Sequence, residues 1–202
     1  LMCRDTDFPP MSLDIYATPG AKIKVTGTNP LIYTWRVDSP VKEQQEHNRF
    51  IEDSRDLWDE FQRLAIKERS MRSASEAERK ALRTKSDSIS SIINQRELKL
   101  MKELPISNVW MEKLLRLSMS LKYNSRFTNK EEILALYDRL NEEQKASIEG
   151  QEIRVNLFPP KTVKEGDDMA DADLFDLDGK VHHLADFKGK YMLLDFWSSG
   201  CG

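Results

Sequence analysis

Cysteine is scarce in this sequence: two are present among 202 residues, Cys3 and Cys201. Two cysteines so far apart in the chain do not make a disulfide framework. A structural zinc site needs about four ligands, and the other soft candidates are His47, His182 and His183. We therefore predict neither a metal site nor a cofactor.

Long apolar runs are also missing. No stretch reaches the roughly 18 consecutive apolar residues that suggest a membrane-spanning helix, and the first ten residues, LMCRDTDFPP, lack the basic and then apolar layout of a signal peptide. Because the chain starts with Leu1 and not with an initiator methionine, this absence leaves export open. A net charge of -3 gives no reason to expect a nucleic-acid partner.

Residues 1–39 have the features of β-structure. Apolar residues alternate on both sides of Pro19 and Gly20 in LDIYATPGAKIKV, residues 13–25, which predicts a hairpin. A second β-rich stretch covers residues 31–37. Two or three strands cannot form an independent core. We therefore interpret residues 1–39 as the C-terminal part of a β-rich N-terminal domain.

Residues 40–158 are predicted to be a helical middle region. One apolar stripe on the first helix has the three- and four-residue spacing of an amphipathic helix; its members are Phe50, Ile51, Leu57, Trp58, Phe61, Leu64 and Ala65. A second helix is expected to end before Pro105, and a third covers residues 108–123.

The end of this region contains three further signals. Thr128 followed by Glu131 predicts a capping box that opens a helix. Gly150 is interpreted as the end of the last helical turn. The stretch IRVNLF, residues 153–158, is predicted to be a short closing strand.

The last part of the chain is expected to be a separate domain. Residues 159–172 are polar and rich in turn residues, which is typical of a linker. Asp178 and Gly179 then separate two short β-like stretches and predict a two-residue hairpin turn. Residues 191–196, YMLLDF, form an almost continuous apolar run, as expected of a strand buried in a sheet.

Two motifs in residues 173–202 resemble a known family. The hairpin FDLDGKVHHLADFKGK and the motif DFWSSGCG are similar to thioredoxin-like domains, in particular the exported bacterial thiol-disulfide oxidoreductases grouped with the alkyl hydroperoxide reductase and thiol-specific antioxidant modules. The resemblance implies that residues 173–202 are the start of such a domain. The predicted fold class is therefore α+β: a partial N-terminal β-sheet, a helical middle region, and the N-terminal hairpin and first core strand of a thioredoxin-like domain.

The same resemblance implies roles for residues at the end of the chain. In the family the motif continues to a second cysteine, so Cys201 would be the attacking thiol at the start of a helix, with Gly202 after it. A helix N-terminus lowers the pKa of such a thiol. Asp195 matches a buried carboxylate that helps to move a proton, and burial favours the protonated form of a carboxylate. Trp197 matches an aromatic side chain that packs beside the active-site turn.

The resemblance predicts that the intact protein reduces or isomerises disulfides in exported proteins. Its partners would be disulfide-containing client proteins and an upstream thiol reductant, and its location the periplasm or cell envelope, with a membrane tether outside these residues left open. We expect this chain to be part of a longer protein and inactive on its own, because the second thiol is absent. We also expect residues 191–196 to dock on the helices or to pair with a second copy if they are not disordered.

Two other functions compete with this hypothesis. A thiol peroxidase of the peroxiredoxin group would carry proline and threonine where this sequence has Leu194 and Ser198, which counts against it. Alternatively, residues 40–150 could be a non-catalytic scaffold that binds other proteins. A residue other than cysteine two positions after Gly202 in the intact protein would favour the scaffold.

Overall fold

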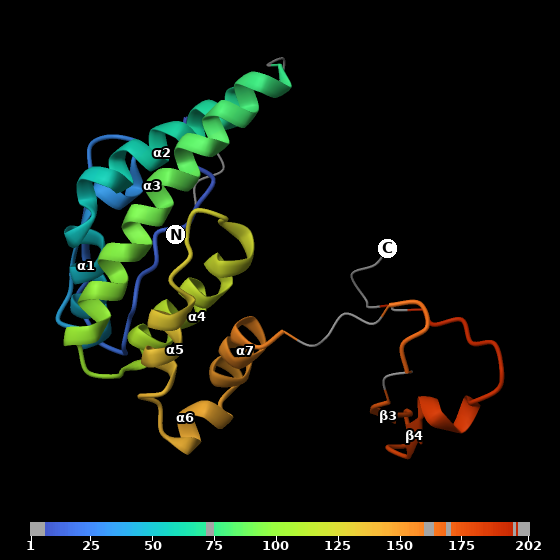
Figure 1. Cartoon of the computed structure of the whole chain (residues 1–202). Coiled ribbons are helices and arrows are strands. Elements are labelled where there is room, and N and C mark those ends of the chain that lie inside the picture. Colours follow the sequence, from blue (N-terminus) through green and yellow to red (C-terminus); the bar gives the residue numbers. More distant parts are fainter. Residues whose placement is uncertain (1–6, 72–74, 160–163, 169–170, 196, 198–202) are drawn as a thin grey trace. The chain divides into compact units, whose positions relative to one another are not determined.

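The computed structural model describes residues 7–71, 75–159, 164–168, 171–195 and 197. It divides into two compact units, residues 1–159 and residues 160–202 (Figure 1). Among the described residues, the buried apolar core lies in the first unit, between Leu13 and Leu157. Secondary structure is mixed, with two small antiparallel sheets beside the helices, which confirms the α+β class at this level.

The first sheet is a hairpin of β1 (Lys24–Thr26) and β2 (Arg36–Asp38), with Val25 opposite Val37. The predicted hairpin around Pro19 and Gly20 is therefore wrong in its pairing. The apolar residues of the expected first strand instead join a small cluster with β2, in which Leu13 is 4% exposed. Burial of these side chains fixes the position of the segment, which is not joined to β1 by a ladder of backbone hydrogen bonds.

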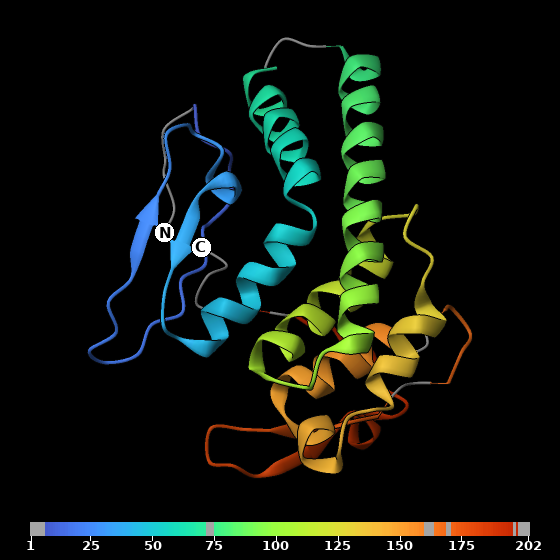
Figure 2. The ribbon, with the colours of Figure 1, turned by 90° about the vertical axis from the view of Figure 1, so that its left-hand side faces the viewer.

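A short 3-10 helix, η1 (Ile32–Thr34), connects the two strands and contacts helix α2 (Arg55–Ser70). The backbone N–H of Tyr33 donates to Oε1 of Gln62 at 3.0 Å, and the Tyr33 ring meets Trp58 edge-on at 4.7 Å. The residues that the sequence assigns to a separate β-rich domain thus pack against the helices within one compact unit (Figure 2).

The first three helices of this unit pack against one another. The first predicted helix is divided at Ser54 into α1 (Lys42–Asp53) and α2 (Arg55–Ser70). α3 (Glu76–Glu103) begins with a complete capping box between Ser75 and Glu78 and runs alongside α2, as both views show (Figures 1 and 2). Their shared core contains the predicted stripe residues Ile51, Trp58 and Leu64.

The main core is formed by α4 (Asn108–Tyr123), α5 (Lys130–Tyr137) and α7 (Ile148–Leu157), together with the end of α3 and part of α1. The short helix α6 (Glu142–Ala146) precedes α7 and has no buried residue. α4 has the bounds that the sequence predicts, and Trp110, Leu114 and Leu117 on it are completely buried. Trp110 also donates its indole N–H to the carbonyl oxygen of Met101 at 3.0 Å.

Three predictions for this region are wrong. Residues 153–157 belong to helix α7 and not to a closing strand, because Ile153 and Leu157 lie one turn apart and both are fully buried while Val155 is exposed; Phe158 is the C-cap. Gly150 lies inside α7, where a Cβ would overlap the carbonyl of Gln144.

The predicted capping box at Thr128 is also absent. The N-cap of α5 is Asn129, whose side-chain amide donates to Oε1 of Glu132 at 2.5 Å. No side-chain hydrogen bond caps the backbone of this helix.

The second unit contains the other hairpin, β3 (Asp173–Phe175) and β4 (Val181–His183), followed by the 3-10 helix η2 (Leu184–Phe187). The hairpin is where the sequence predicts it, but its loop has three residues, Leu177 to Gly179. The N–H of Asp176 donates to the carbonyl of Lys180 at 3.1 Å and closes that loop.

The predicted buried strand at residues 191–196 is not formed. Residues 191–195 carry no strand assignment, and Tyr191 and Leu193 are fully exposed. A strand requires a neighbour to receive its backbone hydrogen bonds, and no described residue pairs with this stretch. Residue 196 lies outside the described part of the chain.

Candidate functional site

The hairpin that precedes the predicted thiol motif is organised by Asp176. Its carboxylate accepts hydrogen bonds from the N–H groups of Asp178 at 3.0 Å and Lys180 at 2.9 Å, and its other oxygen lies 2.9 Å from Nε2 of His182. Gly179 takes a positive φ of 76°, which glycine adopts without steric cost. The hydrogen bond to His182, followed by that from Lys180, lowers the pKa of Asp176.

The neighbouring His183 fixes the end of β4. The ring atom Nδ1 of His183 lies 3.7 Å from the carboxylate of Asp171 and 3.6 Å from that of Asp173. The backbone N–H of His183 donates to the Asp186 carboxylate at 3.0 Å. His182 and His183 are thus each engaged by carboxylates of the same unit. The described residues contain no group of three or more His, Cys, Asp or Glu that could hold a metal ion.

The predicted catalytic residues lie at or beyond the described end of this unit. Asp195 is exposed, and Trp197 is 76% exposed, so neither has the packing that the family resemblance implies. Cys201 and Gly202 lie outside the described residues. The roles of these four residues remain predictions.

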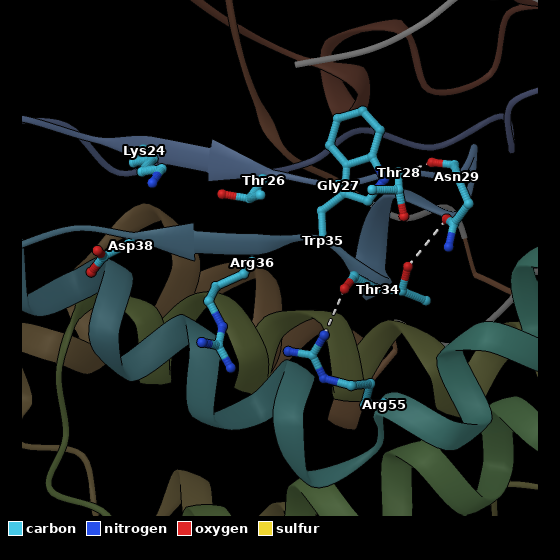
Figure 3. A pocket seen from close by; sticks show the side chains of 10 residues that line it. All are labelled: Lys24, Thr26, Gly27, Thr28, Asn29, Thr34, Trp35, Arg36, Asp38 and Arg55. Atoms are coloured by element: carbon cyan, nitrogen blue, oxygen red, sulfur yellow. Dashed lines mark hydrogen bonds between the residues drawn. The ribbon is translucent and has the colours of Figure 1, made fainter.

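A second candidate site is an open pocket of about 570 Å³ in the first unit, between the β1–β2 hairpin and the start of α2 (Figure 3). Three cationic side chains line it with one carboxylate, and hydroxyl and amide groups complete the wall. The lining residues are Lys24, Thr26, Gly27, Thr28, Asn29, Thr34, Trp35, Arg36, Asp38 and Arg55.

Hydrogen bonds hold one end of this pocket in a defined shape. Oδ1 of Asn29 accepts from the N–H of Leu31 at 2.8 Å, and the carbonyl of Asn29 accepts from the indole N–H of Trp35 at 2.7 Å. Arg55 donates to the carbonyl of Thr34 at 2.7 Å (Figure 3). Trp35 lies so close to Gly27 that a Cβ there would overlap the indole ring.

A third group of polar residues is buried between α1, α3 and α4. The Glu97 carboxylate, 1% exposed, forms ion pairs with Arg116 and with Lys113, whose Nζ is 3.6 Å away. Burial lowers the pKa of Lys113 to about 8. His47 is 4% exposed, and neither of its ring nitrogens has a hydrogen-bond partner among the described residues.

Neither of these two groups was predicted from the sequence, although one signal for the pocket was present. Lys24, Thr26 and Thr28 alternate along the first strand and its extension, which places them on one face. The buried group could not be predicted from the sequence, because charged residues on charged helices are normally exposed to solvent.

Comparison with known proteins gives one partial likeness. The chain is 42% identical over 53 residues to the thiol-disulfide oxidoreductase ResA of Geobacillus thermodenitrificans (strain NG80-2). The match covers 26% of this chain and 30% of the relative, so the chain spans under a third of the curated relative that it matches. No family model matches the chain, and no solved structure matches it. Over about a quarter of its length, the chain is thus related to a thiol-disulfide oxidoreductase.

Proposed function

We propose that the protein of which this chain is a part is a thioredoxin-like thiol-disulfide oxidoreductase that acts on exported proteins. The observation that carries this proposal is the 42% identity over 53 residues to a protein named as such an enzyme. The motif DFWSSGCG supports it, because it places a cysteine directly after an apolar stretch. The hairpin β3–β4 supports it as well, because it forms where the family resemblance predicts one.

The proposed reaction begins with Cys201. Its thiolate attacks one sulfur of a client disulfide, a mixed disulfide forms, and the other client sulfur leaves as a thiolate. A second thiol, supplied from beyond these 202 residues, then attacks the mixed disulfide and releases the reduced client. The enzyme is left with a disulfide, which an upstream thiol reductant reduces. Asp195 would move the proton of the second thiol, and Trp197 and Gly202 would shape the surface beside Cys201.

The remaining assignments follow from the same proposal. The site would be in the periplasm or cell envelope, where client disulfides persist. Among the described residues, no helix is both long and apolar enough to cross a membrane. The 202 residues alone would not turn over substrate, since the second cysteine of the motif is not among them.

An insulin-reduction assay on the intact protein tests the proposal. The intact protein is expected to reduce insulin disulfides with a thiol reductant, and Cys201→Ser is expected to abolish this activity. Cys3→Ser is the matched control and should retain it. Equal activity of the intact protein and its Cys201→Ser variant would refute the proposal. Absence of activity in both would favour the scaffold alternative.

A further inference from the structure

The pocket between the hairpin and α2 contains cationic groups that the protein neutralises only in part. Within the described residues, the side chains of Lys24 and Arg36 make no ion pair or hydrogen bond. Arg55 donates to the carbonyl of Thr34 at 2.7 Å and forms an ion pair with Glu52 at 3.8 Å. The pocket thus presents positive charge in a protein whose net charge is -3.

The strand register explains why these charges gather on one side. Val25 and Val37 face each other on the side of the hairpin where Val37 is buried. Their neighbours alternate to the other side, where Thr26 is opposite Arg36. Figure 3 shows the Arg36 side chain extending from β2 towards the helices, on the same side of the strand as Arg55.

The size and lining of the pocket indicate the class of ligand. A volume of about 570 Å³ lies in the range of small-molecule sites. Guanidinium and ammonium groups bind oxyanions through charge-assisted hydrogen bonds, and the hydroxyl groups of Thr26 and Thr28 add further donors. Because the loop is fixed by hydrogen bonds from Trp35 and Arg55, these groups are positioned before a ligand arrives.

We propose that this pocket binds a small polar molecule that carries a multiply charged oxyanion, either a phosphate ester or a polycarboxylate. Lys24, Arg36 and Arg55 supply the positive charge, and the single carboxylate of Asp38 leaves an excess of cations. This site lies in the first unit and does not depend on the thiol chemistry proposed for the second.

The indole N–H of Trp35 provides a direct readout, because Trp35 lines the pocket while Trp110 is buried in the main core. Glycerol 3-phosphate and citrate are titrated separately into ¹⁵N-labelled chain at constant ionic strength, with sodium chloride as the reference. The Trp35 indole signal, assigned with Trp35→Phe, is expected to shift with a Kd of about 1 mM or lower for at least one of them. The signal of Trp110 should stay in place.

Two variants connect the shift to the pocket. Arg36→Gln is expected to weaken binding about tenfold, because it removes one charge-assisted contact. Lys24→Gln provides a second, independent test. Arg154→Gln is the matched control, since Arg154 is an exposed arginine on α7 away from the pocket and should leave binding unchanged. The anion that shifts the signal identifies the ligand class. No shift with either anion, or equal binding by all three variants, would overturn the proposal.

Discussion

Lowering the pH from 7 to 5 should destabilise this protein through His47. The imidazole is 4% exposed, and the centre of its ring lies 5.5 Å from that of Tyr16. Burial, followed by the positive charges of Lys113 and Arg116, lowers the pKa of His47 from 6.5 to about 3. The folded protein therefore keeps this side chain neutral under mildly acidic conditions.

The sign and size of the effect follow from proton linkage. Below about pH 6.5 the unfolded chain binds a proton at His47, whereas the folded chain does not bind one until about pH 3. The unfolded state thus gains protons first, and the free energy of unfolding falls as the pH decreases through this window. The loss amounts to about 2 kcal/mol at pH 5 and rises to about 5 kcal/mol near pH 3.

Urea denaturation of the wild-type chain and of His47→Leu at pH 7 and pH 5 measures this term. Carboxylates that also titrate contribute to both proteins and cancel in the difference. Between pH 7 and pH 5 the wild type should lose about 2 kcal/mol more than the variant. His182→Gln changes a half-buried histidine of the second unit, outside the buried core of the first, and should behave as the wild type in the unfolding of the first unit. An equal loss in the wild type and His47→Leu would refute the reasoning.

Four substitutions test other parts of the first unit, each by the free energy of unfolding in urea. Gly27→Ala should cost about 1–3 kcal/mol, because the new Cβ overlaps the ring of Trp35, and tryptophan fluorescence should report the displaced ring. Ser75→Ala removes the capping box of α3 and should cost about 1 kcal/mol, whereas Thr128→Ala should change stability by less than about 0.5 kcal/mol. Glu97→Ala leaves the buried Lys113 and the half-buried Arg116 without their carboxylate and should cost about 3 kcal/mol; a loss below about 1 kcal/mol would contradict the role of this ion pair.

Helices with clear periodicity could be predicted from the sequence, whereas the pairing of the first hairpin and the short helix α7 could not. The bounds of α4 were predicted because its buried residues repeat at three and four positions and Pro105 lies just before it. In IRVNLF the alternation of a strand and the four-residue spacing of a helix coincide at Ile153 and Leu157. The segment is helical because both side chains pack into the core, and these packing contacts cannot be read from the sequence alone.

The same limit applies to the two sites in the first unit. Arg36 and Arg55 line one pocket only because the hairpin packs beside the start of α2, a contact between distant parts of the sequence. His47 and Glu97 lie on helices whose charged residues suggest exposure, and their burial depends on how α1, α3 and α4 meet. For the second unit, the hairpin was found through its turn residues, whereas Cys201 was singled out through a family resemblance that the partial relative supports coarsely.

The location of the buried core has a calorimetric consequence. The heat capacity change of unfolding comes from apolar surface that becomes exposed, and in the part of the chain that the structure describes the buried apolar side chains lie between Leu13 and Leu157. A scan of the chain should therefore give a single transition with a change of about 2 kcal/mol/K, as expected for a domain of roughly 150 residues. The described residues of the second unit would add little heat of their own, because their large apolar side chains are already in contact with water before melting begins.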